Sequence, residues 1–144
     1  MAIDVKIIQT FKLFEELNDK ELEQLASIMD IITVKEGEAI VNKGETAHTL
    51  YFILKGSFMI HFSSGKAFTL NTKEDIIGWS TLVTPFNYTG NVTALTAGKL
   101  IAAQGKNLSM LIQSNSELSG KIMKKINSVL SERMNYVKKF SKIK

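Results

Sequence analysis

The sequence predicts a single, mainly β domain with flanking helices, and three observations support this fold class. A chain of 144 residues is long enough to enclose one hydrophobic core but short for two. Between residues 31 and 104, short β-rich runs alternate with glycines, at a spacing typical of sandwiches and barrels. These glycines are Gly37, Gly44, Gly56, Gly65 and Gly78. On both sides of this region the apolar residues return to helical spacing.

The composition is that of an ordinary globular protein. Hydrophobic residues make up 44% of the chain and charged residues 22%, close to the averages for soluble domains. No apolar run approaches the roughly 20 residues of a transmembrane helix, and the N-terminus lacks the basic start and apolar stretch of a secretory signal. The chain contains no cysteine and hence no disulfide. We therefore expect a cytoplasmic protein without a membrane span.

Residues 3–30 are expected to form the N-terminal helices. Apolar residues between Ile3 and Phe14 follow the spacing of one helical face, which predicts a short helix there. Asn18 stands three residues before Glu21, the pattern of a capping box. An apolar periodic stretch follows, so a second helix should begin at this point.

Residues 31–104 are expected to form a β-roll of the jelly-roll kind. The apolar runs 50–54 and 57–62 flank Lys55-Gly56, and the turn-forming residues 63–66 precede a further run over 67–70. Residues 78–91 interrupt the strand pattern, which resumes over 92–103. The interruption is the most informative part of the roll.

Residues 106–144 have helical spacing, with two adjacent apolar stripes. One stripe can cover the roll, and the second then needs another surface, for which the same helix of a second copy is the simplest partner. The alternative is a monomer with one wide stripe. The residues assigned to the expected homodimer helix are Ile122, Ile126, Val129, Leu130, Arg133 and Val137.

The net charge of +4 is concentrated in the C-terminal helix. From Lys121 onward there are many lysines and Arg133, against the single acid Glu132. Such a patch can attract nucleic acid weakly or an anionic membrane surface, but lysines on an amphipathic helix more often form its solvated face.

Specific residues resemble the cyclic-nucleotide-binding domains of the catabolite-activator type. The resemblance is carried by the segments 36–41, 43–45, 49–57 and 75–78, with Thr89, Val92 and Ala94 after them. It covers nearly the whole chain, and it implies a β-roll with N-terminal helices and a long C-terminal dimerisation helix. It further implies that residues 78–91 correspond to the family's phosphate-binding cassette, whose short helix meets the cyclic phosphate with free amides.

The cassette departs from the family pattern at both of its charged anchors. By the resemblance, Trp79 occupies the position of the glutamate that holds the ribose, and Tyr88 that of the arginine that pairs with the phosphate. Thr89 keeps the hydroxyl position. No charged residue lies between Ile76 and Gly98. Tight binding of cAMP is therefore not expected, although a lysine from elsewhere could reach the pocket as a point charge.

Two interpretations of the altered pocket follow. In the first, the pocket binds a small molecule, which is either neutral or aromatic or a weakly bound nucleotide. In the second, the aromatic rings fill the pocket and it binds nothing. The candidate ligand residues are Gly78, Trp79, Ser80, Thr81, Tyr88, Thr89 and Gly90. In the sensor interpretation, ligand binding would shift the C-terminal helix and signal to a downstream protein. The alternatives are a structural interaction module and a divergent cyclic-nucleotide binder in signal transduction or transcription regulation.

Catalytic and metal chemistry have little support in the sequence. His48 and His61 are the only histidines, and they are too far apart for the paired ligands of cupin metal sites. No nucleophile elbow or phosphate-binding glycine loop is present. We expect a non-enzymatic protein without a metal or cofactor. The chain leaves no room after the long helix for a helix-turn-helix, so specific DNA binding is not expected.

Overall fold

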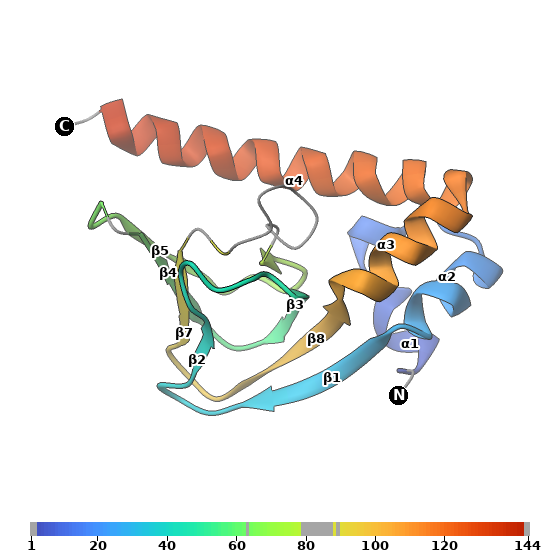
Figure 1. The fold of residues 1–144 in the computed structure, drawn as a ribbon, viewed down its shortest axis with the longest axis horizontal. Helices are drawn as coiled ribbons and strands as arrows, with labels where there is room; N and C mark the ends of the chain where they lie inside the picture. Colours follow the sequence, from blue (N-terminus) through green and yellow to red (C-terminus); the bar gives the residue numbers. More distant parts are fainter. Residues whose placement is uncertain (1–2, 63, 79–87, 89, 143–144) are drawn as a thin grey trace.

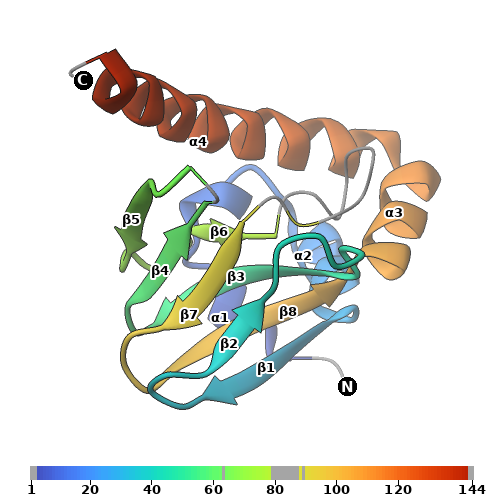
Figure 2. The same cartoon turned by 60° about the vertical axis from the view of Figure 1, so that its left-hand side comes forward.

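The computed structural model describes residues 3–62, 64–78, 88 and 90–142, and for residues 133–142 the backbone alone. Among these residues the strands form two four-stranded sheets, in the orders β1-β8-β3-β6 and β2-β7-β4-β5 (Figures 1 and 2). All recorded strand pairs are antiparallel. This arrangement confirms the mainly β fold class with flanking helices.

The strands are β1 (Met29–Val34), β2 (Ala39–Val41), β3 (Thr49–Lys55), β4 (Phe58–His61), β5 (Ala67–Leu70), β6 (Ile76–Ile77), β7 (Asn91–Ala94) and β8 (Gly98–Gln104). The helices are α1 (Val5–Ile8), the 3-10 helix η1 (Lys12–Phe14), α2 (Asp19–Ala26), α3 (Gly105–Ser114) and α4 (Ser116–Lys142). The turn at Lys55-Gly56 separates β3 from β4, and β4 and β5 pair from Phe58–Leu70 to His61–Ala67, so the expected strands are present.

The stretch expected to form one N-terminal helix is divided in two. α1 ends after Ile8, and Phe11 has an extended backbone (φ −74°, ψ 131°) before η1 begins. The rings of Phe11 and Phe14 then lie stacked, with centroids 5.7 Å apart, and both are almost fully buried. Burial of two aromatic rings outweighs helical continuity here, because each ring removes a large apolar surface from water.

The capping box at the start of α2 is confirmed. The Asn18 side chain accepts a hydrogen bond from the Glu21 amide at 2.8 Å, and the Glu21 carboxylate accepts from the Asn18 amide at 2.9 Å. Two amides that the helix itself leaves unpaired are thereby satisfied.

The interior consists of two hydrophobic clusters. The first joins the helices to one face of the β1-β8-β3-β6 sheet and includes Phe14, Leu25, Phe52 and Ile101. The second lies between the two sheets and includes Ile53, Phe58 and Leu100.

Helix α4 lies across one end of the roll, from α3 beside the N-terminal helices to the β4–β5 hairpin (Figures 1 and 2). Ile122 and Ile126 are 2% and 1% exposed and belong to the first cluster of the protomer itself. Val129 and Leu130 are half-buried against that cluster. The side chains of Arg133 and Val137 lie outside the described residues. In the described part of the chain, no helix has the length and apolar content needed to cross a membrane.

Candidate functional site

The candidate cassette is described at its two ends. Gly78 follows β6 directly, and Tyr88 and Gly90 precede β7. Trp79, Ser80, Thr81 and Thr89, which were also predicted to belong to the site, lie outside the described residues. The geometry of the site is therefore given by Gly78, Tyr88, Gly90 and the segments that contact them.

Gly78 lies at a close approach of two backbone segments. Its φ of +86° is in the left-handed region, and a Cβ added here would come within 2.7 Å of the Thr49 carbonyl oxygen and 3.2 Å of the Tyr88 ring. A side chain at this position would therefore be unfavourable both for the backbone conformation and for the available space. Gly78 thus allows β3 and the Tyr88 ring to pack closely together.

Tyr88 is held by hydrogen bonds at both its side chain and its backbone. Its hydroxyl donates to the Thr49 carbonyl at 2.9 Å and accepts from the Thr49 amide at 3.2 Å. Its amide donates to the Glu45 carbonyl, and its carbonyl accepts from the Gly44 amide, both at 2.9 Å. The residue therefore ties the segment before β3 to the end of the cassette, and its hydroxyl is already engaged with Thr49.

Aromatic side chains line the neighbouring wall of the roll. A Cβ at Gly90 would lie 3.0 Å from the Phe62 ring, and the Phe62 and Phe68 ring centroids are 6.1 Å apart. Burial, assisted by the nearby Tyr88, raises the pKa of Tyr51 above its usual value. Tyr51, Phe62, Phe68 and Tyr88 are all partly buried and pack against the hydrophobic cluster between the two sheets.

A groove of about 630 Å³ lies between β5 and α4. Its described lining is Ala67, Phe68, Thr69, Leu70, Asp75, Val129 and Glu132. The charged groups in this lining are the carboxylates Asp75 and Glu132, so the groove offers no described cation for a phosphate. Neither carboxylate was predicted to line a site, because the segment 67–75 and α4 are brought together only by the fold.

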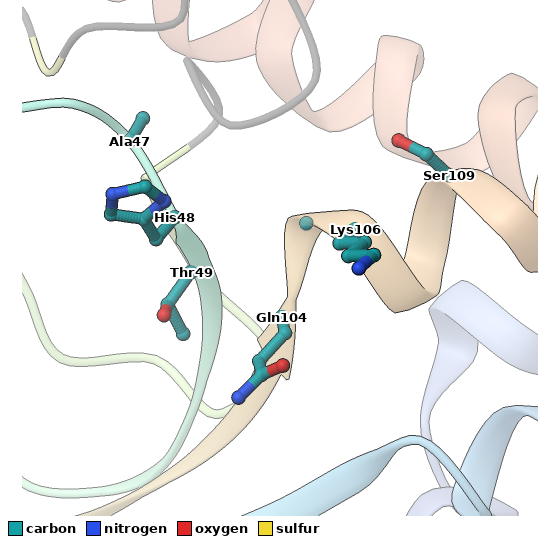
Figure 3. A pocket seen from close by; sticks show the side chains of 7 residues that line it. Ala47, His48, Thr49, Gln104, Lys106 and Ser109 are labelled. Atoms are coloured by element: carbon teal, nitrogen blue, oxygen red, sulfur yellow. The ribbon is translucent and has the colours of Figure 1, made fainter.

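A second cavity, of about 430 Å³, opens where the start of β3 faces the start of α3. In Figure 3, His48 and Thr49 lie on one side of it, and Gln104, Lys106 and Ser109 lie on the other. The Gly105 amide donates to the His48 carbonyl at 2.7 Å and joins the two sides. The sequence had no signal for this cavity, since its two walls are more than fifty residues apart.

Metal-binding clusters are absent from the described residues: no three His, Asp or Glu side chains gather in a manner that could hold an ion. His48 is exposed, and His61 is half-buried on β4. Around Gly78, Tyr88 and Gly90, the described contacts are made by the Tyr88 hydroxyl, backbone groups and aromatic rings.

The comparisons with known proteins agree with this fold. The family model described as "Cyclic nucleotide-binding domain" matches residues 31–115. No curated protein matches the chain.

Solved structures share the fold at low sequence identity. A protein from Geobacter metallireducens GS-15, provisionally named as a cyclic nucleotide-binding protein, has a TM-score of 0.82 at 22% identity, over 92% of this chain and 98% of the other. The regulatory subunit of a cAMP-independent protein kinase A from Trypanosoma brucei has a TM-score of 0.76 at 21% identity, over 96% of this chain and 48% of the other. The sensor domain of the transcriptional regulator DNR from Pseudomonas aeruginosa has a TM-score of 0.68 at 23% identity, over 90% of this chain and 88% of the other.

Proposed function

Because the chain belongs to the cyclic nucleotide-binding domain family, we propose that it is a non-catalytic regulatory module whose cassette does not bind cAMP tightly. The proposal starts from the two positions at which the family's charged anchors are replaced by Trp79 and Tyr88. Binding of a cyclic phosphate in this family depends on an ion pair, and no charged residue lies between Ile76 and Gly98.

The observation that carries the proposal is the engagement of Tyr88 with Thr49. The Tyr88 hydroxyl uses both its donor and an acceptor site on the backbone of Thr49. A phenol that donates to a carbonyl cannot donate the same proton to a phosphate, and it carries no charge at neutral pH. The residue at the arginine position is therefore occupied in holding the roll together.

The size of the effect follows from the loss of the arginine. A bidentate arginine–phosphate pair contributes two charge-assisted hydrogen bonds of roughly 1.5 to 3 kcal/mol each. Their removal should weaken nucleotide binding by about 100- to 10,000-fold. The carboxylates Asp75 and Glu132 in the groove beneath α4 add no compensating attraction for an anion.

Regulatory proteins with the same fold give the proposal a context. One of the similar structures is the regulatory subunit of a kinase that is named as cAMP-independent, and another is the sensor domain of a transcriptional regulator. Similar folds thus occur in a regulatory subunit that is named as cAMP-independent and in the sensor domain of a transcriptional regulator. We propose that this chain acts likewise on a downstream protein.

The proposed module is a homodimer formed through α4. Ile122 and Ile126 are buried in the protomer's own core, so they are not free to form the interface. Leu130 is half-buried, and Val137 follows it by one heptad. We propose that these two positions, with Arg133, form the seam between the copies.

A second candidate function is a structural interaction module with a filled pocket. Packing of the Tyr88 ring beside Gly78, and of the Phe62 ring beside Gly90, favours this alternative, because these rings take up space that a ligand would need. The two candidates differ in one respect: the structural module should be indifferent to small molecules.

The test is thermal unfolding with and without millimolar cAMP, cGMP and a set of neutral aromatic metabolites. A molecule that binds only the folded protein raises its stability by mass action. We expect no shift with either nucleotide for the wild type. In the double variant Trp79→Glu, Tyr88→Arg, which restores both anchors, cAMP should raise the unfolding temperature, whereas Tyr88→Phe should remain unresponsive as the matched control.

Each result decides between the candidates. A shift of the wild type with cAMP or cGMP would overturn the proposal, and so would equal binding by wild type and double variant in calorimetric titration. A shift with a neutral metabolite would favour the sensor. No shift with any compound would favour the structural module.

A further inference from the structure

Strand β1 lies at the edge of its sheet and differs from the other edge strands. In the described chain, β1 and β6 are the edges of one sheet, and β2 and β5 are the edges of the other. β6 has two residues, β2 has three with an irregular register, and β5 has four. β1 has six residues, and all six pair with β8 without a shift in register. It is therefore the longest of these edges, and its pairing is regular.

The outer side of β1 is open to a further strand. In an antiparallel pair a strand uses only part of its backbone groups, so the remaining groups of an edge strand have no strand partner. Outside the strand pairs, none of the backbone hydrogen bonds of the described chain involves residues 31–34. In Figure 1, β8 follows one side of β1, and the other side faces outward.

The sequence of β1 favours strand pairing rather than preventing it. Exposed edges are commonly protected by lysine, by proline or by a bulge. β1 contains neither residue type, its one charge is Asp30, and four β-branched residues follow from Ile31 to Val34. Ile31 is 40% exposed, and it is the one exposed large hydrophobic side chain on a described strand. The edge thus has the composition of a strand that pairs on both sides.

Two lysines beside β1 lack an acidic partner in the described chain. Lys99 on β8 is opposite Thr33 in the register with β1, and opposite Lys55 in the register with β3. Both lysines are exposed, and the ion pairs among the described residues involve neither of them. Like charges directly opposite each other destabilise a sheet. An acid on a strand added beyond Thr33 would offset this repulsion.

The spacing of strands allows Lys99 to meet such an acid. Neighbouring strands lie about 4.8 Å apart, so a strand added to β1 would lie about 10 Å from β8. Lysine carries its charge on a flexible four-carbon stem, which together with a glutamate side chain can span this distance. The side chain between them, that of Thr33, is short and exposed.

We propose that the outer side of β1 binds an extended segment of a partner protein as an added strand, and that this segment carries an acidic side chain beside Thr33, where it meets Lys99. The inference deepens the proposed regulatory function, on which it rests for the existence of a downstream protein. A second copy of β1 does not supply the acid, because its one acid, Asp30, alternates with Thr33 and lies on the opposite face of the strand.

The test uses short synthetic peptides of alternating valine and threonine, in which the central threonine is replaced by glutamate or by lysine. Each is added at up to millimolar concentration to the isotope-labelled full chain, and amide shifts and amide exchange are followed by NMR. The glutamate peptide should slow exchange within residues 31–34 and bind at least about threefold more tightly than the lysine peptide. The glutamate peptide with N-methyl groups on alternate amides should not bind, because it lacks the donors of an added strand.

A charge reversal tests the role of Lys99. In Lys99→Glu the preference should reverse in favour of the lysine peptide, and the variant should remain folded because its carboxylate would lie opposite Lys55. Lys124→Glu is the matched control, since it makes the same charge change at an exposed position of α4. It should keep the preference of the wild type for the glutamate peptide.

The outcomes separate strand addition from general attraction of acids. A reversed preference in Lys99→Glu, with slowed exchange confined to β1, supports the proposal. No binding by either peptide, equal binding of both, binding of the N-methylated peptide, or the same loss of preference in Lys124→Glu would show that it is wrong. Since no nucleotide is used, these outcomes are independent of whether the cassette binds cAMP, which the anchor-restoring variant tests separately.

Discussion

The Tyr88 hydroxyl is hydrogen-bonded to both backbone groups of Thr49, at 2.9 and 3.2 Å. Thr49 is the first residue of β3, and without these bonds its amide and carbonyl would lose partners in a partly buried position. A hydrogen bond of this kind contributes about 1 kcal/mol, and an unsatisfied buried group costs about 1 to 3 kcal/mol. Tyr88 therefore stabilises the fold, and it also belongs to the candidate site.

We expect Tyr88→Phe to lower the free energy of unfolding by about 1 to 2 kcal/mol, because it removes only the hydroxyl. Urea denaturation measures this change, and an unaltered denaturant slope would show that the unfolded state is unaffected. A variant as stable as the wild type would mean that water replaces the hydroxyl at Thr49 without cost.

Gly78 and Gly44 form a matched pair for a second prediction. Both have a φ of +86°, but a Cβ at Gly44 would meet nothing within 4 Å, whereas one at Gly78 would lie 2.7 Å from the Thr49 oxygen. Gly44→Ala should lower the free energy of unfolding by about 1 to 2 kcal/mol, because of the backbone conformation alone. Gly78→Ala should lower it by at least about 1 kcal/mol more, because the added Cβ would also overlap with the Thr49 oxygen. Equal losses in thermal or urea unfolding would contradict the close approach at Gly78.

At the scale of elements, Glu21 connects two helices that are far apart in the sequence. It completes the capping box of α2, and its carboxylate lies 2.7 Å from the Lys121 ammonium on α4. The hydrogen bond from Lys121, followed by that from the Asn18 amide, lowers the pKa of Glu21 below its usual 4.5. The charged carboxylate is thus favoured in the folded state.

The pH dependence of this interaction has a definite sign. Since the folded pKa lies below the unfolded one, the stabilisation is fully present above about pH 4.5 and is lost as the pH falls through the folded pKa. In Glu21→Gln the capping hydrogen bonds can persist but the charge is absent. The difference in unfolding free energy between wild type and variant should therefore shrink between pH 5 and pH 2. Glu23→Gln, at an exposed position of α2, is the control, and a constant difference for Glu21→Gln would refute the assignment.

At the scale of the whole molecule, α4 covers the protomer's own core, and we propose that its later part also contacts a second copy. Leu118, Ile122 and Ile126 close the protomer's own core, while Lys124, Asn127 and Ser131 are exposed. The polar exposed face gives the first half of α4 no apolar seam for a second copy, so the proposed dimer contact is assigned to the positions from Leu130 onward.

We expect the purified protein to be a dimer and Val137→Glu to weaken it by at least about tenfold in Kd, since a buried unpaired carboxylate is unfavourable. Light scattering across a dilution series measures the mass, with Lys124→Glu as the control on the exposed face. A monomeric wild type, or a dimer unchanged by Val137→Glu, would rule out the proposed seam.

Local signals in the sequence determined much of the architecture. The Asn18–Glu21 spacing predicted the start of α2 because a capping box needs only neighbouring residues. The turn at Lys55-Gly56 and the apolar runs beside it predicted β3 and β4, since alternating burial and turn chemistry are also local. The family resemblance rests on local segments that include 49–57, and it was confirmed by the family model, which matches residues 31–115.

Contacts between distant segments were decided by the tertiary structure alone. Tyr88 and Thr49 are 39 residues apart, and Glu74 and Leu13 are 61 apart, so neither hydrogen bond leaves a pattern in the sequence. The division of the first helix at Phe11, and the burial of Ile122 and Ile126 in the protomer itself, have the same origin. Periodicity predicts which residues share a face, but which surface covers that face depends on how the whole chain packs.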